Sequence, residues 1–436
     1  MKRSSPCPVA VPEILCSLFT RRISTAATRS PPFIRPRRRS ACSPSRNFFK
    51  NAAKYFAAGL VKTIQQDIKM EKMKTVLPDY KNCISGLPNS IMRYFGAEPP
   101  GDTLPLIDGF LKKEYKNVVV ILLDGMGVGV AENNLGENGF FRSHLRGTCS
   151  STFPSTTVAA TTSVLSGLLP CSHSWLGWDC YYPQIGKNVT VFRNTEQGTK
   201  NPAADFNVAR TFTGYVSVTD RLRDAGIAAH EVAPYLSPFG SFKDELARVE
   251  ELCRTPERKY VYAYWDEPDT TMHAAGCRSR RAKRILRSLE RQVRRFCRSV
   301  SDTLVIVTAD HGHIDSKGVC IKDYPSVVEC LVRMPSIEPR ALNLFVKEGM
   351  DERFESEFKR YFGEDFILMK KREVIDEKLF GDGEEHPCFC SMLGDYLAVA
   401  TGDLTVFNTE WEAERFKSVH AGLTEAEMIV PLIVIE

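Results

Sequence analysis

The sequence lacks the features that mark a membrane protein or a disulfide-stabilised protein. No apolar run is long enough for a transmembrane helix, and the first residues contain no convincing apolar core of a secretion signal. The fourteen cysteines are scattered, without a C-x-x-C pair or a compact framework, which favours reduced thiols. We therefore expect a cytoplasmic protein with no membrane partner.

Acidic residues are almost missing from the start of the chain. Residues 1–50 hold eleven lysines and arginines but a single acid, Glu13, so the formal net charge of +5 comes from this stretch. The rest of the chain is mildly acidic, which gives no reason to expect a nucleic-acid polymer as a partner. The Arg-, Ser- and Pro-rich composition of residues 1–72 predicts a disordered or dispensable basic extension, with a transit peptide as the alternative.

Residues 73–436 alternate between strand and helix patterns, which is typical of a single α/β domain. The apolar and basic residues of 280–300 separate onto two sides of one predicted helix. The aromatic stretch 177–214, interrupted by Gly, Pro and Asn, predicts an irregular cap over a site. Apolar runs rich in β-branched or aromatic residues predict buried strands of a parallel sheet at 118–123, 260–264 and 303–307.

Metal-competent side chains follow each of these three predicted strands. Asp124 comes directly after the first strand, and Asp269 and His273 follow the second at a spacing of one helical turn. Asp310 and His311 follow the third strand. Ligands of open α/β sheets gather outside the carboxyl ends of the strands, so we expect these side chains to lie close together. Taken alone, an Asp and His pair at this spacing is much more often a surface contact or a helix cap than a metal site.

Other candidates lie outside these strand ends. A late loop supplies His420, and Thr152 precedes a small-residue helix predicted at 156–165. A threonine there is either a nucleophile facing an anion or a helix cap. Carboxylates mixed with imidazoles suit Zn²⁺ or Mn²⁺, and their dispersal over several loops is typical of a catalytic metal site. His313 is expected to be exposed or to support a ligand, and His386 to be structural.

Five short motifs occur in the order and spacing of the alkaline phosphatase superfamily. They most resemble its nucleotide pyrophosphatase/phosphodiesterase (type I phosphodiesterase) branch, over about residues 115–436. This resemblance implies a three-layer α/β/α fold with a mostly parallel central sheet and helices on both faces. The motifs are V-I-L-L-D ending at Asp124, T-F-P beginning at Thr152, E-P-D-x-x-x-H ending at His273, D-H-G beginning at Asp310, and H-x-G beginning at His420.

The resemblance also implies a reaction and the residues that perform it. The enzyme would hydrolyse phosphodiester or nucleotide pyrophosphate bonds of a small phosphate ester or nucleotide, through a phosphothreonine intermediate on Thr152. Phe153 and Ser155 would bind the substrate, although this branch commonly has asparagine where this chain has Ser155. Two divalent ions, Zn²⁺ or alternatively Mn²⁺, would be held by Asp269, His273 and His420, and by Asp124, Asp310 and His311 with the Thr152 oxygen bridging toward the second ion.

Several alternatives remain open. A phosphomonoesterase or a phosphonate hydrolase of the same superfamily would use the same residues, and a non-catalytic metal-binding module is the alternative from another class. A phosphoglycerate mutase relative would carry a serine nucleophile and an inserted domain before Asp269. A sulfatase would need a catalytic cysteine or serine near residue 152, and the C-x-P-S-R match at Cys42 lies too far before Asp124. No feature of the sequence specifies an oligomeric state.

Overall fold

The computed structural model describes residues 73–436, and its first sheet is built from the apolar runs of the sequence. β1 (Asn117–Leu123) lies between two parallel neighbours, β7 (Lys259–Trp265) and β8 (Thr303–Thr308). All residues of β1 and β8 are buried, as expected of strands covered on both faces. The predicted basic extension and the C-x-P-S-R motif lie outside the described residues.

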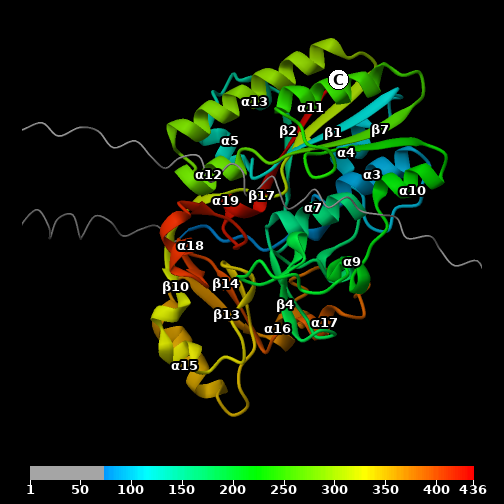
Figure 1. Ribbon diagram of the computed structural model, residues 1–436. Coiled ribbons are helices and arrows are strands. Elements are labelled where there is room, and N and C mark those ends of the chain that lie inside the picture. The colour runs from blue at the N-terminus through cyan, green and yellow to red at the C-terminus, as the bar shows by residue number, and fades with distance from the viewer. Residues whose placement is uncertain (1–72) are drawn as a thin grey trace, which may run out of the picture. The chain divides into compact units, whose positions relative to one another are not determined.

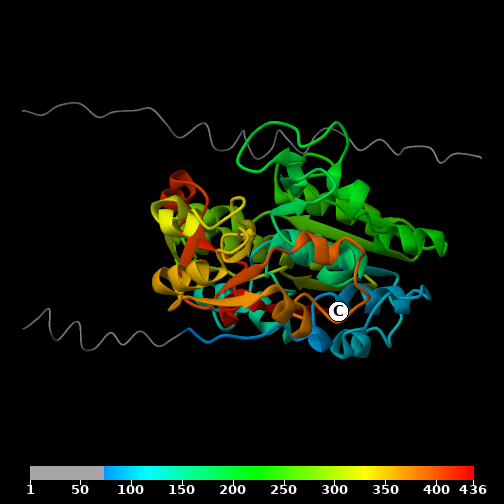
Figure 2. The same ribbon diagram turned by 90° about the horizontal axis from the view of Figure 1, so that it is seen from below.

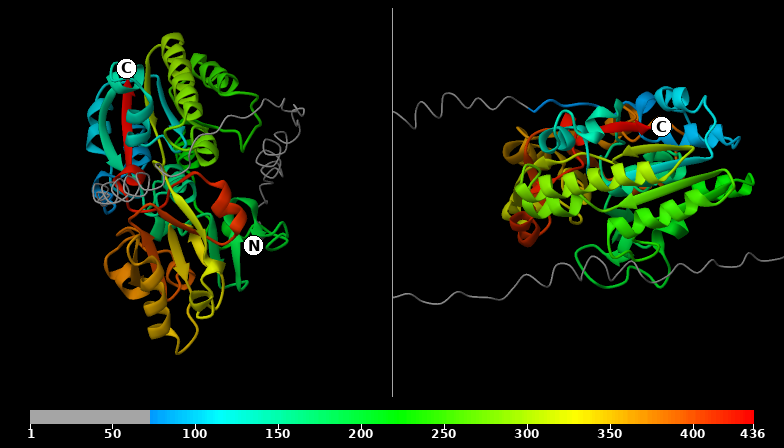
Figure 3. Two further views of the ribbon diagram at one scale, coloured as in Figure 1. Left: turned by 90° about the vertical axis from the view of Figure 1, so that its left-hand side faces the viewer. Right: turned by 90° about the horizontal axis from the view of Figure 1, so that it is seen from above.

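This sheet has six strands in the order β2-β17-β8-β1-β7-β6. β6 (Ala228–Val232) continues the parallel arrangement next to β7. β17 (Ile429–Ile435) runs antiparallel to β8 and to β2 (Leu145–Ser150). The red C-terminal strand therefore lies inside a sheet whose other strands all come from earlier in the chain (Figure 3). The predicted mostly parallel central sheet is confirmed.

Helices cover both faces of the six-stranded sheet (Figure 1). On α13 the apolar residues Leu286, Val293 and Phe296 are buried while the arginines face outward, because the two kinds of side chain repeat with the helical period. One face carries α5 (Val128–Asn134), α11 (Phe242–Arg254) and α13 (Arg280–Ser299); the other carries α3 (Gly86–Tyr94), α4 (Pro105–Phe110), α7 (Thr157–Ser166) and α10 (Val218–Asp224).

A second sheet of seven antiparallel strands was not predicted. Its strand order is β13-β14-β12-β11-β3-β4-β5. α15 (Asp351–Phe362) contributes Phe354, Phe358 and Phe362 to its core, and the yellow and orange segments gather to one side of the green helices (Figure 2). The strands are β3 (Asp179–Tyr182), β4 (Lys187–Thr190), β5 (Thr195–Glu196), β11 (Ser336–Glu338), β12 (Ala341–Leu344), β13 (Phe366–Lys370) and β14 (Tyr396–Ala400).

The stretch 177–214 is more regular than predicted. It forms β3, β4 and β5 of the second sheet, and then the short helix α9 (Val208–Phe212). Its strands have between two and four residues, so they are too short for a side-chain alternation to stand out in the sequence. The expected irregular cap is thus partly an edge of the second sheet.

Short elements connect these layers. Lys74–Glu436 belongs to one compact unit. Within residues 73–436, no helix combines the length and apolar character that crossing a membrane requires. The connecting elements are η2 (Tyr80–Asn82), α6 (Phe140–Ser143), α8 (Pro170–His173), η3 (Val191–Arg193), α12 (Asp269–Ala275), β9 (Ile314–Asp315), β10 (Lys317–Cys320), η4 (Ile321–Asp323), α14 (Pro325–Val328), α16 (Lys371–Asp376), α17 (Phe389–Met392), β15 (Leu404–Phe407), α18 (Glu410–Arg415), β16 (Ser418–Val419) and α19 (Glu425–Met428).

Candidate metal centre

The candidate ligands lie at the carboxyl ends of β1, β7 and β8. Asp124 directly follows β1, Asp269 is the first residue of α12 after β7, and Asp310 follows β8. The backbone joins these ends, since Asp269 N–H donates to the Asp124 carbonyl at 3.1 Å. Gly125 N–H donates to Asp310 Oδ1, also at 3.1 Å. Parallel pairing of three adjacent strands therefore brings carboxylates from distant parts of the chain to one edge.

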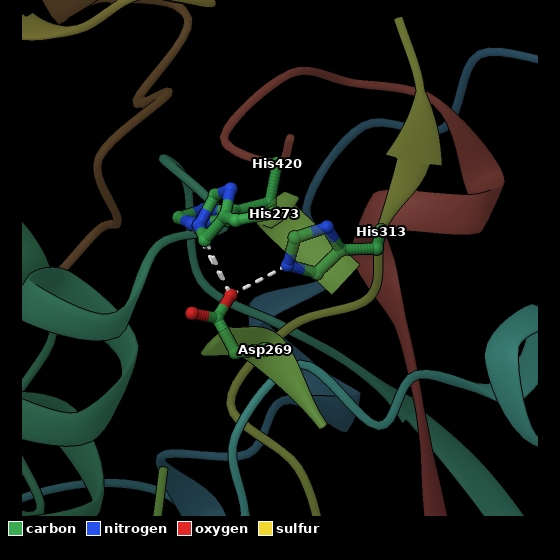
Figure 4. Close-up of side chains that lie close together, drawn as sticks. All are labelled: Asp269, His273, His313 and His420. Atoms are coloured by element: carbon green, nitrogen blue, oxygen red, sulfur yellow. Dashed lines mark hydrogen bonds and ion pairs between the residues drawn. The ribbon is translucent and has the colours of Figure 1, made fainter. Parts of the chain in front are cut away.

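One group of ligand atoms surrounds the Asp269 carboxylate (Figure 4). His273 Nε2 lies 3.3 Å from Asp269 Oδ1, and His420 Nε2 lies 3.8 Å from the same oxygen. His313 Nε2 is closer still, at 2.5 Å. The predicted set of Asp269, His273 and His420 therefore comes together, with His313 as an additional member. His313 is only 3% exposed, so of its two expected roles the exposed one is wrong, and the support of a ligand stays a prediction.

A second, overlapping group lies around His311. Its Nε2 atom is 3.3 Å from Asp124 Oδ1 and 3.6 Å from Asp310 Oδ2. Asp124, Asp269 and His311 offer ligand atoms that lie within 4.8 Å of one another. Tyr264 donates a hydrogen bond to Asp124 Oδ2, which orients that carboxylate. The predicted Asp124, Asp310 and His311 are thus brought together at this second position.

Backbone carbonyls orient three of the imidazole rings. Nδ1 of His273 lies 2.8 Å from the Ser418 carbonyl, and Nδ1 of His420 lies 3.1 Å from the Ser155 carbonyl. Nδ1 of His311 lies 3.0 Å from the Gly312 carbonyl. A carbonyl only accepts hydrogen bonds, so each Nδ1 carries the proton and each Nε2 keeps a lone pair for a metal ion.

The charges at this edge of the sheet favour a cation. Asp124, Asp269 and Asp310 are buried, and the ion pairs found for them among residues 73–436 are all with histidines. Burial and the nearby Asp124 raise the pKa of Asp310 to about 7. Burial and the charge of Asp269 also raise the pKa of Asp124 well above its usual range. Divalent cations relieve this repulsion, and oxygen donors mixed with imidazole nitrogens fit Zn²⁺ or Mn²⁺.

Two threonines of α7 have hydroxyls beside these side chains. Thr161 Oγ1 donates to Asp310 Oδ2 at 3.3 Å, and Thr157 contacts both His311 and Asp124. Thr157 is the first residue of α7, and its Oγ1 lies 3.2 Å from His311 Nε2 and 3.4 Å from each carboxylate oxygen of Asp124. Thr152 is fully buried, and its Oγ1 donates to the Pro154 carbonyl at 3.4 Å. The contacts therefore favour Thr157 over Thr152 as the threonine that faces both His311 and Asp124. Sequence reasoning overlooked it because T-F-P pointed to Thr152, although the predicted helix start at residue 156 was a signal.

The two predicted substrate-binding residues have structural partners. The Phe153 ring is buried against Phe380, with a centroid separation of 5.3 Å, and its N–H donates to the Tyr80 hydroxyl at 3.3 Å. Ser155 Oγ donates to the Gly422 carbonyl at 3.0 Å. The Ser155 carbonyl, as noted, orients His420. The roles that these contacts support are core packing for Phe153 and ligand positioning for Ser155.

Carboxylates and imidazoles at the carboxyl edge of an α/β sheet are an arrangement that suits a metal-dependent hydrolase. The model of the type I phosphodiesterase/nucleotide pyrophosphatase family matches residues 118–420, and the chain belongs to this family. The predicted family is confirmed, and with it the assignment as an enzyme of the alkaline phosphatase superfamily. No curated protein matches the chain significantly.

Solved structures with the same fold include two enzymes. Murine ectonucleotide pyrophosphatase/phosphodiesterase 5, as an inactive variant in complex with AMP, is 15% identical with a TM-score of 0.56, covering 73% of this chain and 87% of that one. Phosphonoacetate hydrolase from Sinorhizobium meliloti in complex with phosphonoformate is 14% identical with a TM-score of 0.54, covering 72% and 89%. At these identities the likeness establishes the fold.

Proposed function

We propose that the chain hydrolyses phosphodiester or nucleotide pyrophosphate bonds with two divalent metal ions and Thr157 as its nucleophile. The observation that carries this proposal is the contact of Thr157 Oγ1 with both His311 and Asp124. Asp269, His273 and His420 would hold one ion, and Asp124, Asp310 and His311 the other. The proposal replaces Thr152 of the sequence prediction with Thr157 and keeps the rest of the ligand assignment.

The chain's own residues determine how the reaction would proceed. Thr157 Oγ1 loses its proton and forms a bond to phosphorus while the bond to the leaving oxygen breaks, and that oxygen takes up a proton. Water then hydrolyses the phosphothreonine ester, which releases the phosphate product and restores the hydroxyl. When bound, the ions supply positive charge that makes a threonine hydroxyl a competent nucleophile near neutral pH. The first N–H groups of α7 lack helical acceptors and carry the positive end of its dipole, so they would stabilise charge on the phosphoryl oxygens.

The substrate proposed is a small phosphate ester or nucleotide. The family assignment supports phosphodiester and pyrophosphate bonds, and the AMP bound to the murine protein supports a nucleotide. Phosphonate hydrolysis is the second candidate, because a phosphonoacetate hydrolase shares the fold. A panel of a chromogenic phosphodiester, a dinucleotide pyrophosphate, a phosphomonoester and a phosphonate would rank these substrates by kcat/KM, and a phosphonate preference would overturn the first candidate.

Two matched variants test the nucleophile. Thr157→Ala should stay folded and keep its metal ions while phosphodiester hydrolysis falls by several orders of magnitude, because the attacking oxygen is gone. Thr157→Ser should retain measurable turnover. Thr152→Ala is the control, and we expect a lower melting temperature from the buried change with near-normal turnover of the folded protein. The reverse pattern, an inactive Thr152→Ala and an active Thr157→Ala, would restore Thr152 as the nucleophile.

Trapping the intermediate provides an independent measurement. A denaturing quench during turnover, followed by mass spectrometry, should find a phosphoryl group on the segment that contains α7. Between Arg146 and Lys187 there is no lysine or arginine, so tryptic cleavage leaves Thr152 and Thr157 in one peptide. Fragment ions from cleavage between the two residues are therefore needed to locate the phosphoryl group. We expect it on Thr157.

A further inference from the structure

His313 has the environment of a metal ligand, although the motif that supplies Asp310 and His311 does not require it. Its side chain is fully buried, and Nε2 points at Asp269 Oδ1 from 2.5 Å. The centroid of its ring lies 4.8 Å from that of His273 and 5.1 Å from that of His420. Figure 4 shows the three rings around one carboxylate. Asp269, His273, His313 and His420 each offer one ligand atom within a 4.8 Å span.

Ser418 orients two of these rings through different atoms. Its carbonyl accepts from His273 Nδ1 at 2.8 Å, and its hydroxyl lies 3.1 Å from His313 Nδ1. With the proton on Nδ1 of His313, its Nε2 lone pair faces the same centre as those of His273 and His420. Ligating histidines commonly have such a partner on the other ring nitrogen, which fixes both the tautomer and the ring plane.

Hydrogen bonding alone does not satisfy this cluster. Three imidazole Nε2 atoms lie between 2.5 and 3.8 Å from the single oxygen Oδ1 of Asp269. When the rings of His273 and His420 are neutral, with their protons on Nδ1, their Nε2 lone pairs face a carboxylate oxygen that also only accepts. A cation between the four atoms turns these repulsive contacts into favourable ones.

Gly125 leaves the space that the His313 ring occupies. A Cβ atom at this position would lie 2.9 Å from His313 Cδ2 and 3.1 Å from the Asp269 Cβ. Gly125 also has a φ of +73°, which other residues adopt at a cost. The glycine after Asp124 therefore permits both the turn out of β1 and the close approach of His313 to Asp269.

We propose that His313 is a fourth protein ligand of the metal site formed by Asp269, His273 and His420, and that Ser418 positions it. This inference rests on the proposed two-metal function. One site would then be filled by four protein side chains, as in a tetrahedral Zn²⁺ site. The other site would have three protein ligands beside Thr157, leaving a position for the reacting oxygen. The two ions should consequently differ in affinity, with the four-ligand site binding more tightly.

The test compares metal binding by the wild type with that of His313→Gln. Glutamine can still donate a hydrogen bond toward Asp269 but is a poor zinc ligand. Zn²⁺ competition with a chromophoric chelator should show that one of the two sites loses more than about 100-fold in affinity. Mutation of a group that only hydrogen-bonds to a metal ligand already lowers metal affinity about 10–100-fold, and loss of a ligand should cost more. Ser418→Ala should lose about 10–100-fold at the same site. His144→Gln, a change on the outer part of the fold, should leave both affinities unchanged.

Spectroscopy and crystallography separate ligation from simple positioning. In the Co²⁺-substituted protein, His313→Gln should change the visible absorption of one ion only. A crystal structure of the zinc-loaded wild type should place His313 Nε2 at about 2.0–2.1 Å from zinc. The inference is overturned if this nitrogen lies beyond coordination distance, or if His313→Gln retains wild-type affinity and spectrum. The wild-type crystal structure decides the matter even if the variant fails to fold.

The two proposals fail in different ways. If His313 does not ligate, two zinc ions still bind and Thr157→Ala still abolishes turnover, so the proposed function stands. If the wild type binds no zinc after loading, both proposals fall together.

Discussion

The orientation of each histidine ring at the candidate site depends on the contact that its Nδ1 atom makes. Nδ1 of His273, His311 and His420 each meets a backbone carbonyl, so the ring orientation depends on the surrounding loops. A histidine that is held this way is already ordered before an ion binds. Binding the ion therefore costs little additional side-chain entropy. The candidate metal centre is therefore largely preformed by the backbone.

His420→Ala tests the division of the ligands into two sets. Removing this imidazole should weaken or empty the site around Asp269 while the site around Asp124, Asp310 and His311 keeps its ion. Elemental analysis after zinc loading and desalting should then give about one ion per chain instead of two. Equal loss from both sites would show that this division of the ligands is wrong.

At the scale of elements, the helix α11 contains a buried acid without a partner. Glu245 is fully buried, and neither of its carboxylate oxygens has a hydrogen-bond partner within residues 73–436. Burial, with the charge of Asp266 nearby, raises the pKa of Glu245 to about 9. The folded protein thus keeps this carboxyl protonated at neutral pH, whereas the unfolded chain, with a pKa of about 4.3, ionises it.

The free energy of unfolding should therefore fall as the pH rises from about 4 to about 9. Between about pH 4 and pH 9 the unfolded state binds fewer protons than the folded state. The contribution of Glu245 to the free energy of unfolding is therefore fully present below pH 4 and is lost as the pH rises toward 9. The loss is up to about 1.4 kcal/mol per pH unit. Glu245→Gln removes the ionisation and should be more stable than the wild type at pH 8, with the difference shrinking toward pH 5. Melting curves at both pH values measure this, and a pH-independent difference would contradict it.

At the scale of the whole molecule, charge is distributed very unevenly along the chain. The first fifty residues carry a large excess of basic residues, while the remaining chain is mildly acidic. Within residues 73–436, one core cluster lies around the six-stranded sheet and a second lies beside it. The sequence features of 1–72 include no apolar periodicity that would add to these cores. We propose that residues 73–436 are the catalytic domain; the cytoplasmic location stays a prediction.

A chain beginning at Met73 should keep the fold, the metal ions and the turnover of the full chain. The reason is that the ligands and both sheets lie after this residue. Melting temperature and kcat/KM for the same phosphodiester, measured side by side on both chains, check this expectation. A large loss of either value in the shortened chain would mean that the extension contributes to the domain.

The sequence by itself determined the central sheet and most of the side chains that gather at its carboxyl edge. β-branched runs such as β1 and β8 are readable because complete burial removes any need for polar residues within them. Asp124, Asp269 and Asp310 follow these strands directly or within one turn, and parallel pairing then forces their proximity. The expectation that they gather needed only their positions after the strands, which are local properties of the chain. The order of the strands in the sheet came from the tertiary structure.

Tertiary structure alone decided which threonine and which additional histidine lie at the site. Thr152 and Thr157 are only five residues apart, and the turn between them, which local propensity does not specify, determines which hydroxyl faces His311. His313 lies beside Asp269 because Gly125 leaves room for its ring and the Ser418 hydroxyl contacts its Nδ1 atom. Gly125 and Ser418 are almost 300 positions apart in the chain, so the sequence alone does not place them together. The second sheet likewise depends on pairing between β3 and β11, too distant and too short for sequence periodicity to reveal.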